Sequence, residues 1–111
     1  MQAIIAADDS LGRVRNHACE LTSLYLTIQS YADELEALDF RACPAAFKQG
    51  FSQHILAWQQ LLPLVAPYDS LRGEMHDLFA QIEQSTDSTN FKAGVAQVWS
   101  TWALIEEAIE E

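Results

Sequence analysis

Apolar residues recur at helical spacing along most of this chain of 111 residues. The first run steps by four and three residues alternately through these positions: Val14, Ala18, Leu21, Tyr25, Ile28, Ala32 and Leu35. Such steps place side chains on one face of an α-helix, whereas a half-buried β-strand needs steps of two. The run therefore predicts a long amphipathic helix over residues 10–38, which follows the helix-starting side chains of Asp8 and Asp9.

Three further segments show the same helical stripe. The stretch over residues 44–62 begins with Pro44, whose missing N–H is not needed in the first turn of a helix. The stretches over 70–84 and 90–110 each follow polar residues that can cap a helix start. No segment alternates as a strand would, and the chain contains no internal repeat.

Four helices with short connections predict an all-α fold, an antiparallel up-down-up-down four-helix bundle. At this length, residues 1–111 should form a single domain, with residues 1–8 as a loosely ordered lead-in. Gly50 and Gly94 fall inside the helical patterns, and we expect them to permit close contact between helices.

The charge balance excludes several classes of partner. The chain has 16 acidic residues against 6 lysines and arginines, for a net charge of -10. Nucleic acid is disfavoured because phosphate binding is driven by cations, and anionic membrane surfaces are disfavoured for the same reason. No apolar run reaches the roughly 18 to 20 residues that a membrane span needs.

Cys19 and Cys43 could form a disulfide in an oxidising compartment or remain free thiols in a reducing one. If Cys19 lies early in a continuous helix over 10–38, about 28 Å of helix separates it from the helix end. A disulfide needs Cα atoms within about 7 Å of each other. The geometry therefore favours two free thiols.

The charges leave an uncharged band across three predicted helices, at residues 21–32, 49–68 and 93–105. Interface cores are depleted in charge and rich in aromatic residues. The band predicts a docking surface for a second copy or another protein, and an ordinary solvent-facing surface of Gln, Ser and Thr is the alternative. The candidate contact residues are Trp99, Leu104, Leu56, Leu61, Gln53 and Gln60.

A ligand-binding bundle is the alternative hypothesis. His54 lies beside the most apolar stripe, where a histidine is commonly a core residue with one ring nitrogen hydrogen-bonded. It could instead ligate haem in a pocket formed with Trp58, Trp102 and Met75. The Cys-x-x-Cys-His motif of covalently attached haem does not occur in the sequence.

A divalent metal is a second form of this alternative. His17 and Glu20 are three residues apart and share a helix face. The predicted topology brings them to the same end of the bundle as His76 and Glu106. Imidazole and carboxylate groups together can hold zinc or iron, although the Glu-x-x-His pair of di-iron bundles is absent.

A metal-dependent nucleotide hydrolase is the third hypothesis. The acidic runs 74–77 and 106–110 are similar to the pairs that hold magnesium in all-helical nucleotide pyrophosphohydrolases, but their order is reversed. Almost no basic residue is placed to meet a triphosphate, and no Gly-rich loop or nucleophile set occurs. We therefore expect no catalytic residues, and a non-enzymatic acidic bundle that acts through protein–protein contact.

The segment from Cys43 to Trp58 reads CPAAFKQGFSQHILAW. It resembles a segment that recurs in small exported bacterial helical-bundle proteins of uncharacterised function, and it covers 16 of the 111 residues. The resemblance implies a helical bundle in the periplasm or envelope, and it implies no reaction. The start of the chain, MQAIIAADD, lacks the basic region of a signal peptide, so we expect a cytoplasmic protein if the chain is complete as given.

Overall fold

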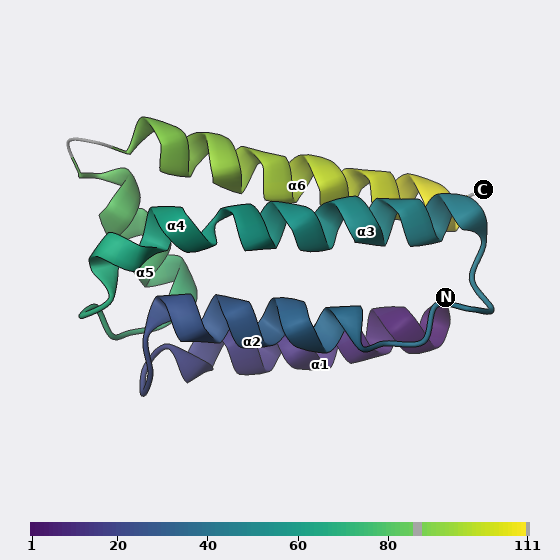
Figure 1. The fold of residues 1–111 in the computed structure, drawn as a ribbon, viewed down its shortest axis with the longest axis horizontal. Coiled ribbons are helices and arrows are strands. Elements are labelled where there is room, and N and C mark those ends of the chain that lie inside the picture. The colour runs from purple at the N-terminus through teal and green to yellow at the C-terminus, as the bar shows by residue number, and fades with distance from the viewer. Residues whose placement is uncertain (86–87, 111) are drawn as a thin grey trace.

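The computed structural model describes residues 1–85 and 88–110, which contain helices and no strand (Figure 1). The helices are α1 (Gln2–Ala18), α2 (Leu24–Glu36), α3 (Ala45–Gln60), α4 (Leu62–Val65), the 3-10 helix η1 (Ala66–Tyr68), α5 (Met75–Glu83) and α6 (Thr89–Glu110). The predicted all-α class is therefore confirmed. None of these helices is both long enough and apolar enough to cross a membrane.

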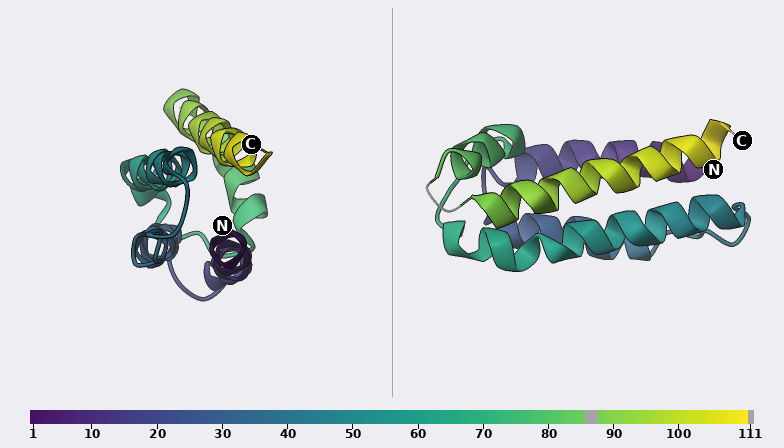
Figure 2. Two further views of the ribbon diagram at one scale, coloured as in Figure 1. Left: turned by 90° about the vertical axis from the view of Figure 1, so that its right-hand side faces the viewer. Right: turned by 90° about the horizontal axis from the view of Figure 1, so that it is seen from above.

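The long helices α1, α2, α3 and α6 lie side by side, and each runs opposite to the one before it (Figure 1). They give an elongated molecule of 42 × 26 × 18 Å. α3 and α6 share the most extensive contact, and α1 and α2 form a hairpin beside them (Figure 2). α5 is short and packs against both α1 and α6 at one end of the molecule.

Two glycines allow α6 to pack closely against α3 and against Leu61, the residue that follows α3. A Cβ atom on Gly94 would lie 2.7 Å from Cδ2 of Leu61, and one on Gly50 would lie 3.3 Å from Cγ1 of Ile105. Leu61 and Ile105 are fully buried, so both contacts lie in the interior of the protein. The prediction that both glycines permit close helix contact is confirmed.

The continuous helix predicted over residues 10–38 is wrong, because the chain reverses at residues 19–23. Ser23 caps the start of α2, where its hydroxyl accepts a hydrogen bond from the backbone N–H of Leu26 at 3.1 Å. The apolar spacing runs unbroken through the turn, yet Val14 and Leu21 on that stripe are 65% and 91% exposed. A periodic pattern reports helical spacing and does not show where a chain turns back.

The start of the chain also departs from the prediction of a loose lead-in over residues 1–8. α1 begins at Gln2, and Ile4 is buried in the core. The reversal after residue 18 explains this difference. α1 lies antiparallel to α2, so its first turns have a neighbouring helix against which they can pack.

The other predicted helices are close to those observed, except for the one over residues 70–84. That helix begins at Met75, because Gly73 has a φ of +156°, which no α-helix contains. Glu74 then caps the helix by accepting a hydrogen bond from the backbone N–H of His76 at 2.7 Å. Residues before this loop form α4 and η1, where Pro63 and Pro67 occupy early helical positions.

Both cysteines are buried free thiols, in agreement with the expectation from sequence. The reason differs from the one first given, since the helix that was to separate them is broken. Cys19 precedes α2 and Cys43 follows it. The 13 residues of α2 span about 20 Å, which keeps the two thiols at opposite ends of that helix.

Candidate ligand-binding site

A cavity of about 330 Å³ lies between α1, α5 and α6, with α2 and α3 forming its floor. Within the described residues, α1 and α6 make almost no direct contact, and α5 spans the space between them at one end only (Figure 2). All three tryptophans of the chain line the cavity: Trp58, Trp99 and Trp102. The arrangement of helices therefore leaves an aromatic hollow that the side chains do not fill.

His54 fixes the floor of this cavity through both of its ring nitrogens. The hydroxyl of Thr101 donates to the backbone carbonyl of Gln97 at 2.9 Å, so it accepts a hydrogen bond from Nδ1–H of His54, also at 2.9 Å. Nε2 of His54 then accepts the indole N–H of Trp58 at 3.1 Å. Burial lowers the pKa of His54 to about 4, so the ring is neutral at pH 7 with its proton on Nδ1.

Arg15 lies over the aromatic floor that His54 positions. Its guanidinium carbon is 4.6 Å from the ring centroid of Trp58 and 4.5 Å from that of Tyr31. The two rings meet edge to face, with centroids 5.2 Å apart, so they form a corner that holds the cation. Cation–π contacts of this kind contribute about 0.5 to 2 kcal/mol, more where the cation is desolvated.

Asp8 enters the cavity from the same face of α1. It precedes Arg15 by seven residues, or about two helical turns. The hydroxyl of Tyr31 donates a hydrogen bond to its carboxylate. Burial raises the pKa of Asp8, and burial together with the charge of Asp8 raises the pKa of Tyr31. α1 therefore presents an acid and a base on the face that it turns towards the core.

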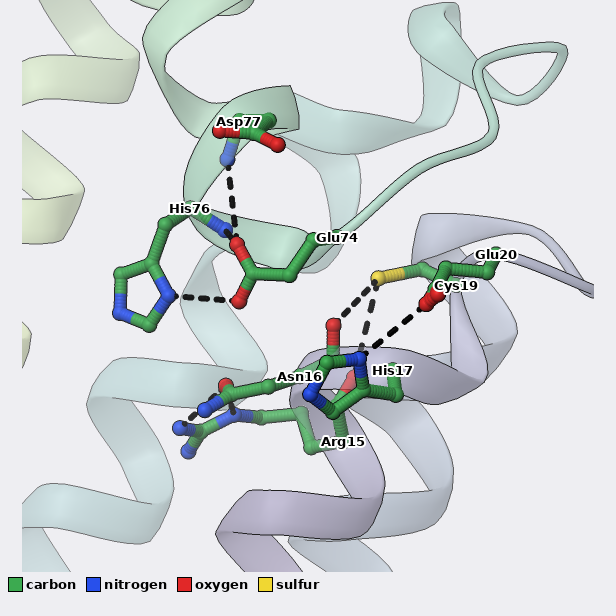
Figure 3. A network of polar contacts seen from close by, with 8 residues as sticks. All are labelled: Arg15, Asn16, His17, Cys19, Glu20, Glu74, His76 and Asp77. Carbon is green, nitrogen blue, oxygen red and sulfur yellow. Dashed lines mark hydrogen bonds and ion pairs between the residues drawn. The ribbon is translucent and has the colours of Figure 1, made fainter.

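The start of α5 is anchored to the end of α1. The backbone N–H of Gly73 donates to the carbonyl of Cys19 at 3.1 Å. Nδ1 of His76 lies 2.8 Å from Oε2 of Glu74, and this hydrogen bond lowers the pKa of Glu74 (Figure 3). The ring of His76 and the guanidinium of Arg15 extend towards the same side of this network (Figure 3).

The four pocket residues predicted from sequence come together in this cavity. His54, Trp58, Trp102 and Met75 all line it, and Met75 is almost fully buried. The haem ligand proposed for this pocket is not free, however, because both nitrogens of His54 already have partners. Iron ligation through Nε2 would break the hydrogen bond from Trp58.

The four metal-ligand candidates do not come together. His17 pairs with Glu20 at 3.1 Å, and His76 pairs with Glu74 instead. Glu106 belongs to the last turns of α6 and His17 to the last turn of α1, and these two helix ends lie at opposite ends of the molecule (Figure 1). Over the described residues, no group of three or more His, Cys, Asp or Glu side chains could hold a metal ion.

The interface candidates do not share one surface. Leu61 is fully buried and cannot contact a partner. Leu104 and Gln53 line a shallow groove between α3 and α6, whereas Trp99 lies at the mouth of the aromatic cavity and is 64% exposed. The remaining candidates are exposed on α3: Leu56 and Gln60.

Sequence reasoning missed Asp8, Arg15 and Tyr31 as cavity residues. The signal was present in their spacing, because Asp8 and Arg15 are in phase with Ile4 and Leu11 on one face of α1. Two charged residues within an apolar stripe are unusual, since a buried charge is costly unless it is paired or used. The assumption that residues 1–8 were loosely ordered concealed this pattern.

Comparison of the chain with protein-family models, with curated proteins and with solved structures finds no match. Function is therefore inferred from the geometry and chemistry of the cavity.

Proposed function

We propose that this protein binds a small organic molecule in the cavity between α1, α5 and α6, with the long helices acting as an antiparallel bundle that supports it. The carrying observation is a hollow of about 330 Å³ lined by every tryptophan of the chain together with a few fixed polar groups. Ligand sites are typically concave, mostly apolar and about 300 to 1,000 Å³ in volume, with a small number of placed polar groups.

The polar groups of the cavity also favour ligand binding over a purely structural core. Arg15 and Asp8 occupy inward positions of α1, where an apolar residue would cost less to bury. His54, Trp58 and Tyr31 hold each other in fixed orientations through hydrogen bonds and ring contacts. A ligand would therefore meet walls that need little rearrangement, which lowers the entropic cost of binding.

A substitution at the mouth of the cavity tests this proposal. Ala80 is exposed on α5 and lines the cavity. We expect Ala80→Phe to block entry, so that monocyclic aromatic fragments that raise the melting temperature of the wild-type protein no longer do so. Ala96→Phe is the matched control, because Ala96 is exposed on α6 away from the cavity lining. Equal stabilisation of both variants by the same fragments would contradict the proposal.

Protein–protein contact is the second candidate function. Val14, Leu21 and Leu26 are large apolar residues exposed on the α1–α2 hairpin, and Val14 and Leu26 line one shallow groove there. Exposed apolar patches commonly mark interfaces. The expected partner is a second copy or another protein, so Val14→Ser with Leu26→Ser should lower any self-association seen by sedimentation velocity. A monomer at every concentration, with no captured partner, would count against this candidate.

A further inference from the structure

Arg15 has hydrogen-bond donors that its neighbours do not use. Among the residues that the structure describes, it forms no ion pair, and Nε and Nη2 donate to Oδ1 of Asn16 at 3.2 and 2.9 Å. A contact with the hydroxyl of Tyr31 engages Arg15 as well. A guanidinium carries five N–H donors in a planar fork. The stacking of Arg15 on two rings fixes that fork, and its remaining donors suit a planar oxyanion.

His76 lies at the same corner of the cavity as Arg15. Arg15 is one helical turn before Cys19, and His76 is three residues after Gly73, so the backbone bond between Cys19 and Gly73 brings their elements together. Nδ1–H of His76 donates to the carboxylate of Glu74, so Nε2 of the neutral ring, on the opposite edge, is an acceptor and leaves Arg15 as the donor for an anion (Figure 3). Arg15 and His76 both line the cavity.

Two carboxylates also line the cavity, those of Asp8 and Glu83. Asp8 precedes Arg15 by seven residues on α1, and Glu83 follows His76 by seven on α5, which is about 10 Å along each helix. Asp8 is also engaged by the hydroxyl of Tyr31. Burial raises the pKa of Asp8 and the charge of Arg15 lowers it, so these two side chains interact, and at the junction of α1 and α5 the carboxylate of Glu74 pairs with His76. Arg15 remains the cationic donor of the cavity lining.

We infer that the ligand is a small organic carboxylate with an aromatic or alicyclic body, whose carboxylate is held by Arg15; this inference rests on the proposed function. The body of the ligand lies against Trp102 and Phe79, which line the same cavity. A volume of about 330 Å³ equals roughly eleven water molecules at about 30 Å³ each, which suits a ligand of about ten non-hydrogen atoms.

Three ligands of one shape and different charge test the inference by titration calorimetry. They are phenylacetate, its neutral isostere phenylacetamide and the cation 2-phenylethylammonium, each titrated into the full chain. We expect phenylacetate to bind about tenfold or more tightly than phenylacetamide, because hydrogen bonds to a charged group are the stronger kind. The cation should bind most weakly, since Arg15 already occupies the aromatic corner.

Substitution of Arg15 should remove the preference for the anion. In Arg15→Gln we expect phenylacetate and phenylacetamide to bind equally, and in Arg15→Lys part of the preference should survive with the charge. Arg13→Gln is the control, because Arg13 is exposed and paired with Asp9 outside the cavity. Circular dichroism establishes whether each variant is folded. If Arg15→Gln does not fold, the comparison of the three ligands on the wild-type protein still tests the inference.

The outcomes separate this inference from the proposed function. If the amide or the cation binds as tightly as phenylacetate, or if Arg15→Gln keeps the preference, the ligand class is wrong and the cavity remains a binding site. If none of the three binds at millimolar concentration, the carboxylate inference is overturned. The proposed function then depends on the fragment series with Ala80→Phe, and it fails as well if that series shows no stabilisation.

Discussion

The neutral imidazole of His54 sits at the centre of the polar contacts beneath the cavity. It accepts the indole N–H of Trp58 at Nε2 and donates to Thr101 from Nδ1, and the bond from Trp58 depends on the uncharged form of the ring. Protonation would place a second N–H against the indole donor and leave a buried charge without a counterion. The residue therefore orders the aromatic floor and makes that order sensitive to pH.

The stability of the protein should fall in acid because of this residue. The pKa of His54 is about 4 in the folded chain against 6.5 ordinarily, so the unfolded chain binds the extra proton between these values. The free energy of unfolding should decrease as the pH drops from 6.5 to 4, by about 3 kcal/mol in total. Urea unfolding at pH 7 and pH 4.5 measures this change.

The contribution of His54 is isolated by comparison with variants. His54→Gln cannot take up the proton, so it should show a smaller loss of stability in acid than the wild-type protein. His17→Gln is the control, because His17 is exposed and pairs only with Glu20. A pH dependence that is identical in wild type and His54→Gln would show that His54 is not held neutral by burial.

Helix contacts give opposite expectations for two glycines. In Gly94→Ala the new Cβ would lie 2.7 Å from the buried Leu61, and overpacking should outweigh the gain in helix propensity by about 1 kcal/mol. In Gly12→Ala the nearest atoms belong to Arg15 at 3.5 Å, an ordinary contact, so stability should rise by about 0.5 to 1 kcal/mol.

Chemical denaturation of Gly94→Ala and Gly12→Ala measures whether the free energy of unfolding falls in the first variant and rises in the second. Each substitution adds the same methyl group inside a helix, so differences in propensity cancel and the neighbouring atoms decide the result. Stabilisation by Gly94→Ala equal to that by Gly12→Ala would contradict the close approach of α6 to Leu61.

The helices were largely predictable from sequence, and their boundaries were not. The apolar spacing predicted α3 and α6 to within two residues, because Pro44 and the polar residues before α6 mark their starts. The turn between α1 and α2 was not predicted, because no Gly or Pro marks it and the only local signal is Ser23, which caps α2. α5 begins later than the predicted helix over residues 70–84, because the backbone conformation of Gly73 is not helical. The apolar spacing does not reveal such a conformation.

At the scale of the whole molecule, the cavity results from a helix that is too short to fill its place. α5 has 9 residues and α6 has 22, so α5 closes only one end of the space between α1 and α6. Sequence patterns predicted that His54, Trp58, Trp102 and Met75 could share a pocket, since all were assigned to apolar helix faces. The sequence patterns did not predict that α1 forms a wall of this pocket, because α1 reaches that position only when the chain turns back at residues 19–23.

The most direct test of the cavity as a ligand site uses its tryptophans as reporters. All three line the cavity, so the three indole N–H signals in a ¹H–¹⁵N correlation spectrum report on it and on little else. Titration with phenylacetate and then with phenylacetamide should move the signals of Trp58, Trp99 and Trp102 together, with one dissociation constant for each ligand that binds. Shifts confined to the exposed Trp99, or no saturable shift with either ligand, would contradict a binding site between α1, α5 and α6.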